Sequence, residues 1–372
     1  MLTRVSIQNY KSLRDIDVEL GPLTVLVGQN STGKSNFIDA LRFVSDAVTH
    51  GLDQALLERG GIKVVQYASQ LSNEIGINFL LQFEFEGNIG EYRFNLSTQE
   101  NEYEIVYEKA AVNGVGYEVQ QGKPNFIGLE QDLSLPWNND RLRLFLPVSA
   151  GVVGPLGKIR FFLMSAGYYS IFPNDLRSPQ RPSIPERLFE TAFNLNSVLR
   201  RMKKETPDAF ERLRLAFVQM VPGVQGIDVE LIGGYLVTKL QYQYGDRVET
   251  FDLSQESDGT LRLLGILTAL YQVPTPPLIT IEEPELAVHP GALKMLYEVL
   301  EEASHRTQLI ITTHSPDLIS YCAPENLRIV EKVEGATKIA PLEQRQIDIV
   351  NEQLFSTSDL LRIEGLRPER PN

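Results

Sequence analysis

The segment that most constrains this chain is Gly28–Ser35, GQNSTGKS, which lies between two apolar-rich runs. The run LTVLV before it has the composition of a buried strand, and the run NFIDALRFVSDAV after it has apolar residues at helical spacing. A glycine-rich turn at the start of a helix directs backbone N–H groups at an anion, and Lys34 and Ser35 add an ammonium group and a hydroxyl. The segment predicts a loop that binds the phosphates of a nucleotide, with Lys34 at the terminal phosphates and Ser35 on Mg²⁺. The residues expected to contact the nucleotide are Gly28, Asn30, Ser31, Thr32, Gly33, Lys34, Ser35 and Asn36.

A second polar cluster is expected where two other apolar strands end. LITIEEPE is an apolar run followed by Glu282 and Glu283, and QLIITTHSP is another, followed by His314. Open parallel sheets bind ligands at the carboxyl ends of their strands. We expect Glu282 to hold hydrated Mg²⁺, Glu283 to polarise the attacking water and His314 to donate a hydrogen bond to a phosphate oxygen. The alternatives are a charged strand end for the glutamates and a helix cap after the histidine, where Ser315 is the better cap.

A third stretch, SQESDGTLRLL at residues 254–264, changes abruptly from polar to helical. Taken alone, it predicts a helix whose first turn is capped by Ser257 and Asp258. It has no obvious reactive group, so its meaning depends on the other motifs.

Four segments together resemble the ABC-type ATPases related to SMC proteins, RecF and the OLD family, and the short members without long arms look closest. These segments are IQNYKSLRDIDVELGPLTVLVGQNSTGKSNFIDAL, SDGTLRLL, ITIEEPELAVHP and IITTHSPDLI. The resemblance covers roughly residues 1–50 and 250–335 well and the middle only loosely. It implies an α/β fold of the P-loop NTPase, ABC-ATPase type, hydrolysis of ATP with Mg²⁺, and a homodimer that encloses the nucleotide.

The resemblance also implies roles for particular residues. Leu278–Glu283 corresponds to the Walker B strand, Glu285–His289 to the D-loop, and His314 to the switch histidine. Ser257-Asp-Gly-Thr resembles the ABC signature, in which Ser257 and the Gly259 amide would meet the nucleotide of a second protomer. The helix-cap interpretation is compatible with that role.

Three further points follow from the resemblance. Lys11 and Ser12, in NYKSLRD, resemble the residues after the first strand that often approach the nucleotide. Glu282 stands where many relatives have aspartate, which implies that Mg²⁺ is held through water. The Q-loop glutamine is not placed, and the candidates are Gln66, Gln70 and Gln82.

The remaining pattern predicts a mixed or parallel sheet core with an antiparallel meander and a helical insertion lobe. Phe79, Leu81, Phe83 and Phe85 alternate on one face, and further alternating runs follow up to about residue 120. Helices are expected at about 186–204 and at 207–220, after an irregular Pro- and Gly-rich connection that contains short helical pieces. The expected divisions are 1–124, the first part of the ATPase domain; 125–225, the insertion lobe; 226–341, the second part of the ATPase domain; and 342–372, a tail.

Composition limits the surroundings in which the chain acts. The formal charge of −13 excludes a surface that is basic all over, so binding of nucleic acid would require a local basic patch. The segment at residues 200–214 holds six basic and three acidic residues and is either such a patch or a solvated helix face. With one cysteine, Cys322, and no apolar run of about 18 residues, we expect a cytoplasmic protein with no membrane span.

These patterns favour a homodimeric ATPase that drives a separate effector. The motif set for ATP is complete and no second catalytic centre stands out, so the effector is expected to be another protein, plausibly a nuclease in bacterial anti-phage defence or DNA maintenance. The defence context comes from the resemblance alone. An ATP-gated DNA clamp is the alternative, motivated by the basic segment, and a transporter ATPase subunit fits the motifs but not the middle region.

Overall fold

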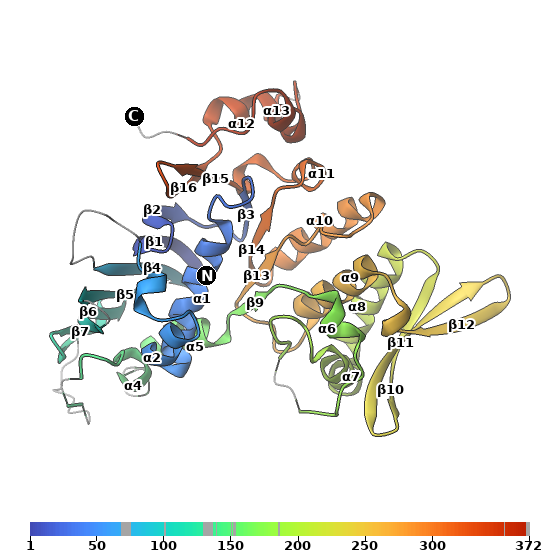
Figure 1. Ribbon diagram of the computed structural model, residues 1–372, viewed down its shortest axis with the longest axis horizontal. Helices are drawn as coiled ribbons and strands as arrows, with labels where there is room; N and C mark the ends of the chain where they lie inside the picture. The colour runs from blue at the N-terminus through green and yellow to red at the C-terminus, as the bar shows by residue number, and fades with distance from the viewer. Residues whose placement is uncertain are drawn as a thin grey trace. The chain divides into compact units, whose positions relative to one another are not determined.

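The computed structural model describes residues 1–67, 76–99, 102–128, 137–138, 140–149, 151, 154–184, 187–352 and 354–369. The chain forms two compact units (Figure 1). Unit 1 comprises Met1–Ala166, Leu327–Ile347 and Leu366–Asn372, and unit 2 comprises Gly167–Asn326 and Asp348–Gly365. The four divisions expected from the sequence stay a prediction.

Unit 1 contains a meander of antiparallel strands, a phosphate-loop helix and a short parallel pair. Its strands are β1 (Leu2–Tyr10), β2 (Leu13–Glu19), β3 (Leu23–Val27), β4 (Ile77–Phe85), β5 (Asn88–Gln99), β6 (Glu102–Val112), β7 (Val115–Gln120), β8 (Lys123–Ile127), β15 (Leu327–Val333) and β16 (Ala336–Pro341). Its helices are α1 (Lys34–His50), α2 (Leu52–Leu57), α3 (Ile62–Val65), α4 (Leu146–Ser149) and α5 (Leu156–Ser165), and α12 (Gln344–Asn351) contains a boundary between the units.

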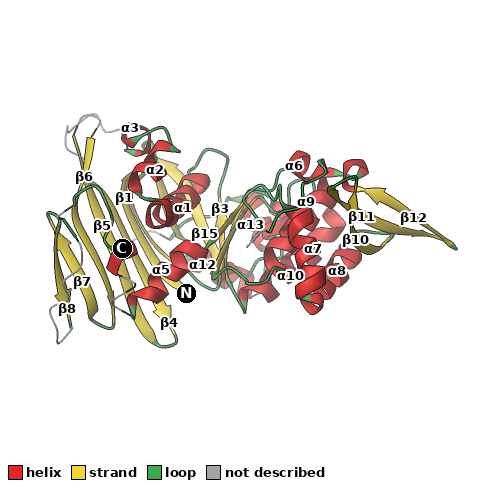
Figure 2. Ribbon diagram, turned by 90° about the horizontal axis from the view of Figure 1, so that it is seen from below, coloured by secondary structure: helices red, strands yellow, loops and turns green. Residues whose placement is uncertain are grey.

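The meander of unit 1 is a seven-stranded sheet in the order β2-β1-β4-β5-β6-β7-β8, with every neighbouring pair antiparallel. Figure 2 shows α1 and α5 over one face of this sheet. Phe79 of β4 packs on that side, with ring centroids 5.5 Å from Phe43 of α1 and 4.9 Å from Phe94 of β5. The predicted meander and the buried face of β4 are confirmed, because alternation by two places one set of side chains against the helix.

The parallel part of unit 1 positions the phosphate loop. β3 pairs in parallel with β15, and β15 pairs with β16 in antiparallel register, so that Thr337 of β16 lies opposite Lys332. The chain returns from far along the sequence to make this pairing.

Unit 2 contains a second parallel group, a helical layer and a separate three-stranded sheet. Its strands are β9 (Gly167–Tyr169), β10 (Val224–Ile232), β11 (Tyr235–Tyr244), β12 (Arg247–Asp252), β13 (Leu278–Glu282) and β14 (Gln308–Thr313). Its helices are α6 (Pro173–Arg177), α7 (Leu195–Glu205), α8 (Pro207–Met220), α9 (Asp258–Tyr271), α10 (Pro290–Ser304), α11 (Pro316–Ile319) and α13 (Thr357–Ile363), with 3₁₀ turns at Leu253–Gln255 and Pro324–Asn326.

The buried strands of unit 2 run parallel. β13 pairs with β14 on one side and with β9 on the other. All six residues of β14 and the first four of β13 are buried, as expected for strands covered on both faces. The antiparallel sheet β10-β11-β12 forms a separate layer. Among the helices of the described chain, none is both long and apolar enough to cross a bilayer.

One expectation about secondary structure was wrong. The helix expected at about 186–204 begins only at Leu195, because the side chain of Asn194 closes a turn before it. Asn194 accepts a hydrogen bond from the Phe189 N–H and donates one to the Arg187 carbonyl, both at 2.9 Å, and Ala192 has a φ of 64°. The connection expected to be irregular with short helical pieces contains α4, α5 and α6, as expected, and also the strand β9, which is too short to show a period.

Candidate active site

The predicted phosphate loop connects β3 to α1 in unit 1. A Cβ at Gly28 would lie 2.2 Å from the carbonyl oxygen of Val330, so no side chain fits there. A Cβ at Gly33 would lie 2.0 Å from the hydroxyl oxygen of Thr337. Gly33 also has a φ of 110°, in the left-handed region that favours glycine. The strands β15 and β16 therefore shape the loop together with its own sequence.

Lys34, the first residue of α1, is almost fully buried. Its ammonium group donates hydrogen bonds to the carbonyl oxygens of Gly28 at 2.7 Å and Gln29 at 3.0 Å. The hydroxyl of Thr32 donates to the same Gln29 oxygen at 2.9 Å. These bonds hold a positive charge beside the loop, where a phosphate would gain charge-assisted hydrogen bonds.

The other predicted loop residues lie around Lys34. Asn30, Ser31 and Ser35 are exposed, and Ser31 has a φ of 66°. Asn36 is half-buried and donates from Nδ2 to the hydroxyl of Ser12 at 2.7 Å. Exposed polar groups at the start of α1 are compatible with a nucleotide and a metal, and their contacts with either stay a prediction.

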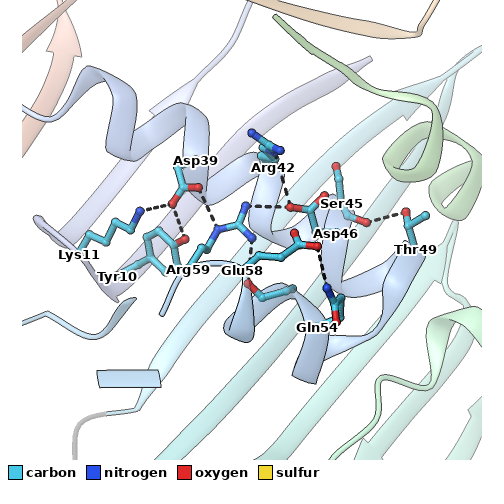
Figure 3. A network of polar contacts seen from close by, with 11 residues as sticks. Tyr10, Lys11, Asp39, Arg42, Ser45, Asp46, Thr49, Gln54, Glu58 and Arg59 are labelled. Atoms are coloured by element: carbon cyan, nitrogen blue, oxygen red, sulfur yellow. Dashed lines mark hydrogen bonds and ion pairs between the residues drawn. The ribbon is translucent and has the colours of Figure 1, made fainter. Parts of the chain in front are cut away.

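Lys11, expected to approach the nucleotide, lies in a network of charged side chains around Asp39 and Asp46 of α1 (Figure 3). Its ammonium group is 2.5 Å from Oδ2 of Asp39, and the hydroxyl of Tyr10 donates to the same oxygen at 2.7 Å. Arg59 donates to Oδ1 of Asp39 and to Asp46, both at 2.9 Å. Burial alone would raise the pKa of Asp39, but the bonds from Lys11 and Tyr10 and the charge of Arg59 outweigh it and lower that pKa. The pattern around Lys11 gave no sign of Asp39 or Arg59.

The second cluster forms in unit 2, where β13 and β14 end side by side. The N–H of Glu283 donates to the Thr312 carbonyl at 3.0 Å, and Glu283 has a φ of 45°, unusual for a non-glycine residue. Its Oε1 lies 3.1 Å from Nδ1 of His314. The structure therefore brings Glu283 and His314 together, as the parallel pairing predicted. Glu282 lies in register with Thr312 on the last rung of the pair.

The contact with Glu283 constrains the protonation of His314. A carboxylate only accepts hydrogen bonds, so Nδ1 of His314 must carry the proton in this contact. The outer nitrogen Nε2 then donates to a phosphate only in the protonated ring and accepts in the neutral one. The expected donation from His314 therefore requires imidazolium while Glu283 stays bound to it.

The structure adds two residues to this cluster. Glu285 is buried, and the hydroxyl of Thr313 donates to its Oε1 at 2.5 Å. Arg262 of α9 is buried and donates to the carbonyl of Glu283 at 3.3 Å. A single arginine in the apolar stretch DGTLRLLGILTALY was the available signal for Arg262, and Glu285 was expected only as part of the D-loop. Ser315 caps α11 by accepting from the Leu318 N–H at 3.4 Å, which confirms the expected cap.

The polar stretch before α9 is a helix cap. The hydroxyl of Ser257 accepts from the Thr260 N–H at 3.2 Å, and Asp258 pairs with Arg177 at 2.6 Å. Gly259 lies against the D-loop, because a Cβ there would be 2.2 Å from the carbonyl oxygen of Ala287. The cap by Ser257 is therefore confirmed, whereas Asp258 pairs with Arg177 rather than capping the helix, and contact with a second protomer's nucleotide stays a prediction.

A cavity of about 500 Å³ opens at the same place in unit 2. Its lining includes Ser257, Gly259 and His289 as well as the apolar side chains of Met220 and Leu263. Residues expected in the signature and in the D-loop thus share one cavity within a single chain.

The Q-loop glutamine is still not placed. Gln70 lies outside the described residues, Gln66 donates to the Thr98 hydroxyl at 2.9 Å, and Gln82 lies on β4.

In the segment at 200–214, three basic side chains have partners inside unit 2. These are Arg201 to the Val273 carbonyl at 2.8 Å, Lys203 to Asp228 at 2.6 Å and Arg214 to Glu211 at 2.6 Å.

Comparisons with known proteins agree with the resemblance. A family model described as "AAA domain, putative AbiEii toxin, Type IV TA system" matches residues 23–320. The OLD nuclease of Thermus scotoductus is 24% identical over 348 residues, which cover 89% of this chain and 62% of that relative. The chain therefore spans less than two thirds of the length of this relative.

Solved structures resemble the fold. An SMC head bound to the winged-helix domain of ScpA has a TM-score of 0.58 at 15% identity, with 93% of this chain and 99% of that chain covered. An SMC head with an extended coiled coil, from Pyrococcus furiosus and bound to the C-terminal domain of ScpA, has a TM-score of 0.57 at 12% identity, with 95% and 99% covered. The SMC head of Thermotoga maritima has a TM-score of 0.50 at 17% identity, with 92% and 99% covered. The fold is that of an SMC-head-like ATPase.

Proposed function

We propose, from the premise that this chain belongs to the AAA-domain family whose model its residues 23–320 match, that it binds and hydrolyses ATP as a nucleotide-linked homodimer. Its family is that of the SMC- and OLD-like ABC-type ATPases. The observation that carries the proposal of hydrolysis is the 3.1 Å contact between Glu283 and His314 at the ends of two parallel strands.

The phosphate loop supports ATP as the ligand. A Cβ at Gly28 or at Gly33 would collide with Val330 or Thr337, so glycine at both positions lets β15 and β16 pack closely against the loop and hold its backbone in place. Lys34 adds a charge that the loop carbonyls already hold in place. Ser35 and, through water, Glu282 are the residues that would hold Mg²⁺, which when bound supplies charge neutralisation at the phosphates.

Glu283 is proposed as the general base. Its left-handed backbone and its bond to Thr312 turn its carboxylate toward His314 rather than along the strand. A water bonded to this carboxylate would lose its proton to Glu283 as it attacks. His314 orients the carboxylate and, when protonated, donates from Nε2 to the phosphate oxygen that gains charge.

The cavity lined by Ser257, Gly259 and His289, the signature cavity, is proposed as the site for the nucleotide of a second copy. Ser257, Gly259 and His289 line it and lie at or near helix N-termini, where backbone N–H groups favour an anion. Two copies arranged by a two-fold axis would each complete the other's site. Residues Asn30, Ser31, Thr32, Asn36 and Lys11 are proposed as further contacts with each copy's own nucleotide.

A test replaces Glu283 with Gln, which keeps the shape and removes the basic oxygen. We expect ATP turnover to fall by about 100-fold or more and an ATP-dependent dimer to accumulate, measured by phosphate release and by light scattering. Glu298→Gln, on the exposed face of α10, is the matched control and should change neither. Unchanged turnover in Glu283→Gln would remove Glu283 from the role of base.

We also propose that the ATPase acts in the cytoplasm on a separate effector of nuclease class, in anti-phage defence or DNA maintenance. The name of the relative, a nuclease, and the family description, which mentions a toxin–antitoxin system, support this context. Copurification of an untagged neighbouring gene product, identified by its mass, tests it. Recovery of the ATPase alone, with and without ATP, would count against a stable effector complex.

DNA contact has weaker support. Three of the six basic side chains at 200–214 bond to unit 2 itself, which favours a structural face. Salt-dependent DNA binding that is lost on changing Arg200 and Lys204 together would revive the DNA clamp.

A further inference from the structure

A chain of hydrogen bonds ties the phosphate loop to β16. Nδ2 of Asn36 donates to the hydroxyl of Ser12 at 2.7 Å, and the hydroxyl oxygens of Ser12 and Thr337 are 2.7 Å apart. The hydroxyl of Thr337 donates to the carbonyl of Thr32, in the loop, at 2.8 Å. The backbone N–H of Thr337 also donates to the Ser12 carbonyl at 2.8 Å, and Thr337 is 0% exposed.

The direction of each bond follows from the number of hydrogens. The Thr337 hydroxyl has one hydrogen, and it is used on the Thr32 carbonyl. The contact between the two hydroxyls therefore requires Ser12 to donate to Thr337, and the amide of Asn36 donates to Ser12. All three bonds point the same way and end on the loop, an arrangement in which each bond strengthens the next.

The last bond fixes a peptide plane. The carbonyl of Thr32 and the N–H of Gly33 belong to one trans peptide and point in opposite directions. Holding the carbonyl on β16 therefore turns the Gly33 N–H away from β16. The contact is tight, since a Cβ on Gly33 would lie 2.0 Å from Oγ1 of Thr337. Lys34 follows directly, so the same plane also sets the start of α1.

We propose that Thr337 is a positioning residue for the phosphate loop, whose hydroxyl orients the Thr32–Gly33 peptide so that its N–H faces the terminal phosphates, with Ser12 and Asn36 keeping that hydroxyl in place. Thr337 lies beyond the residues that match the family model, and its sequence surroundings, EGATKIAP, carry no motif. The identity of the ligand rests on the proposed function, whereas the bond to the loop does not.

The test compares Thr337→Val, which keeps the shape and removes the hydroxyl, with Thr337→Ser, which keeps the hydroxyl. In Thr337→Val we expect the Kd and KM for MgATP to rise about tenfold while kcat changes less than about twofold. Hydrogen exchange of the loop amides over residues 28–37, measured without nucleotide, should be faster. Thr337→Ser should stay close to the parent in every measurement. Thr268→Val is the matched control, because this buried hydroxyl bonds to the Leu264 carbonyl within its own helix.

Several outcomes would overturn the proposal. If Thr337→Val keeps the parental KM for MgATP and the parental hydrogen exchange of the loop amides, the hydroxyl has no role in positioning the loop. If Thr337→Ser shows the same defects as Thr337→Val, the effect does not come from the hydroxyl that Thr337→Ser keeps but from the methyl group. If Thr337→Val does not fold, Ser12→Ala removes the donor to Thr337 instead and should raise KM about threefold; an unchanged KM there would reject the chain of bonds. A parent that does not bind MgATP would reject the proposed function, and the exchange measurement would still decide the role of Thr337.

Discussion

The hydroxyl of Thr313 donates a 2.5 Å hydrogen bond to the buried carboxyl group of Glu285. The same hydroxyl oxygen accepts from the Ser315 N–H at 3.0 Å. Glu285 lies two residues after Glu283, and Thr313 directly precedes His314. Burial raises the pKa of Glu285, and the bond from Thr313 partly opposes that rise. One buried contact therefore joins the two segments that carry the proposed base and its histidine.

Thr313→Val should loosen this junction. The variant keeps the shape of the side chain but removes the donor to Glu285 and the acceptor for Ser315. We expect kcat for ATP to fall about tenfold, because His314 and Glu283 lose their fixed geometry, while KM stays within about twofold. Thr313→Ser should restore kcat. Equal kcat values for the parent and Thr313→Val, measured by phosphate release, would show that the junction has no part in hydrolysis.

Ser257→Arg should separate binding from hydrolysis. The arginine would enter the signature cavity, which belongs to unit 2, and the phosphate loop of unit 1 is unaltered. We expect nucleotide binding to stay close to the parental value while hydrolysis and the ATP-dependent dimer are lost. Loss of the helix cap should cost about 1 kcal/mol of stability, which thermal unfolding would show separately.

Ser254→Arg is the control for Ser257→Arg, because Ser254 is exposed on the turn before it. It adds the same charge outside the cavity and should hydrolyse ATP normally. Normal hydrolysis by Ser257→Arg would leave the stretch as a helix cap only.

Glu108→Gln should destabilise unit 1 strongly. Oε1 of the buried Glu108 accepts from the hydroxyls of Tyr92 and Tyr117 and from the Leu146 N–H, and its Oε2 accepts from the Phe145 N–H at 2.6 Å. A glutamine amide has one acceptor, so in either orientation its NH₂ group faces one of the two backbone N–H groups. We expect the free energy of unfolding to fall by about 2–4 kcal/mol, measured by denaturant titration.

The control for Glu108→Gln is Glu91→Gln, at a partly exposed pair with Lys109 on the same sheet. It should cost less than about 1 kcal/mol. Equal losses in the two variants would mean that the four donors around Glu108 do not depend on a carboxylate.

Asp39→Asn should reduce stability in a pH-dependent way. The pKa of Asp39 is lowered in the folded chain, so its contribution is present above its ordinary value of 3.8 and is lost as the pH falls through the lowered pKa. We expect the free energy of unfolding to fall by about 3 kcal/mol at pH 7, since the buried Arg59 keeps its charge. The difference in this free energy between parent and variant should narrow below about pH 4. Asp17→Asn, which breaks an exposed pair with Arg4, should cost less than about 1 kcal/mol at pH 7. A difference in the free energy of unfolding that stays the same at every pH would contradict a stabilising role for the charge of Asp39.

Local patterns predicted much of this fold. The phosphate loop, the strand ends at Glu283 and His314, and the helix at 207–220 each lie within a continuous run whose period or end signals are set by nearby residues. The helix expected from about residue 186 failed because Asn194 closes a turn against Arg187 and Phe189, a competition that helical spacing does not show.

The sequence by itself determined which candidate groups the chain offers for binding and hydrolysing a nucleotide, because GQNSTGKS, EEPE and THSP each hold those groups within a few residues. Only the tertiary structure decided how those groups are held. Thr337 meets Thr32 across 305 residues, Thr313 meets Glu285 across 28, and Gly259 meets Ala287 through their backbones. Such contacts form only when strands and helices pack together. The sequence shows that a threonine or a glycine is present, but it does not show which distant residue that side chain or backbone will contact.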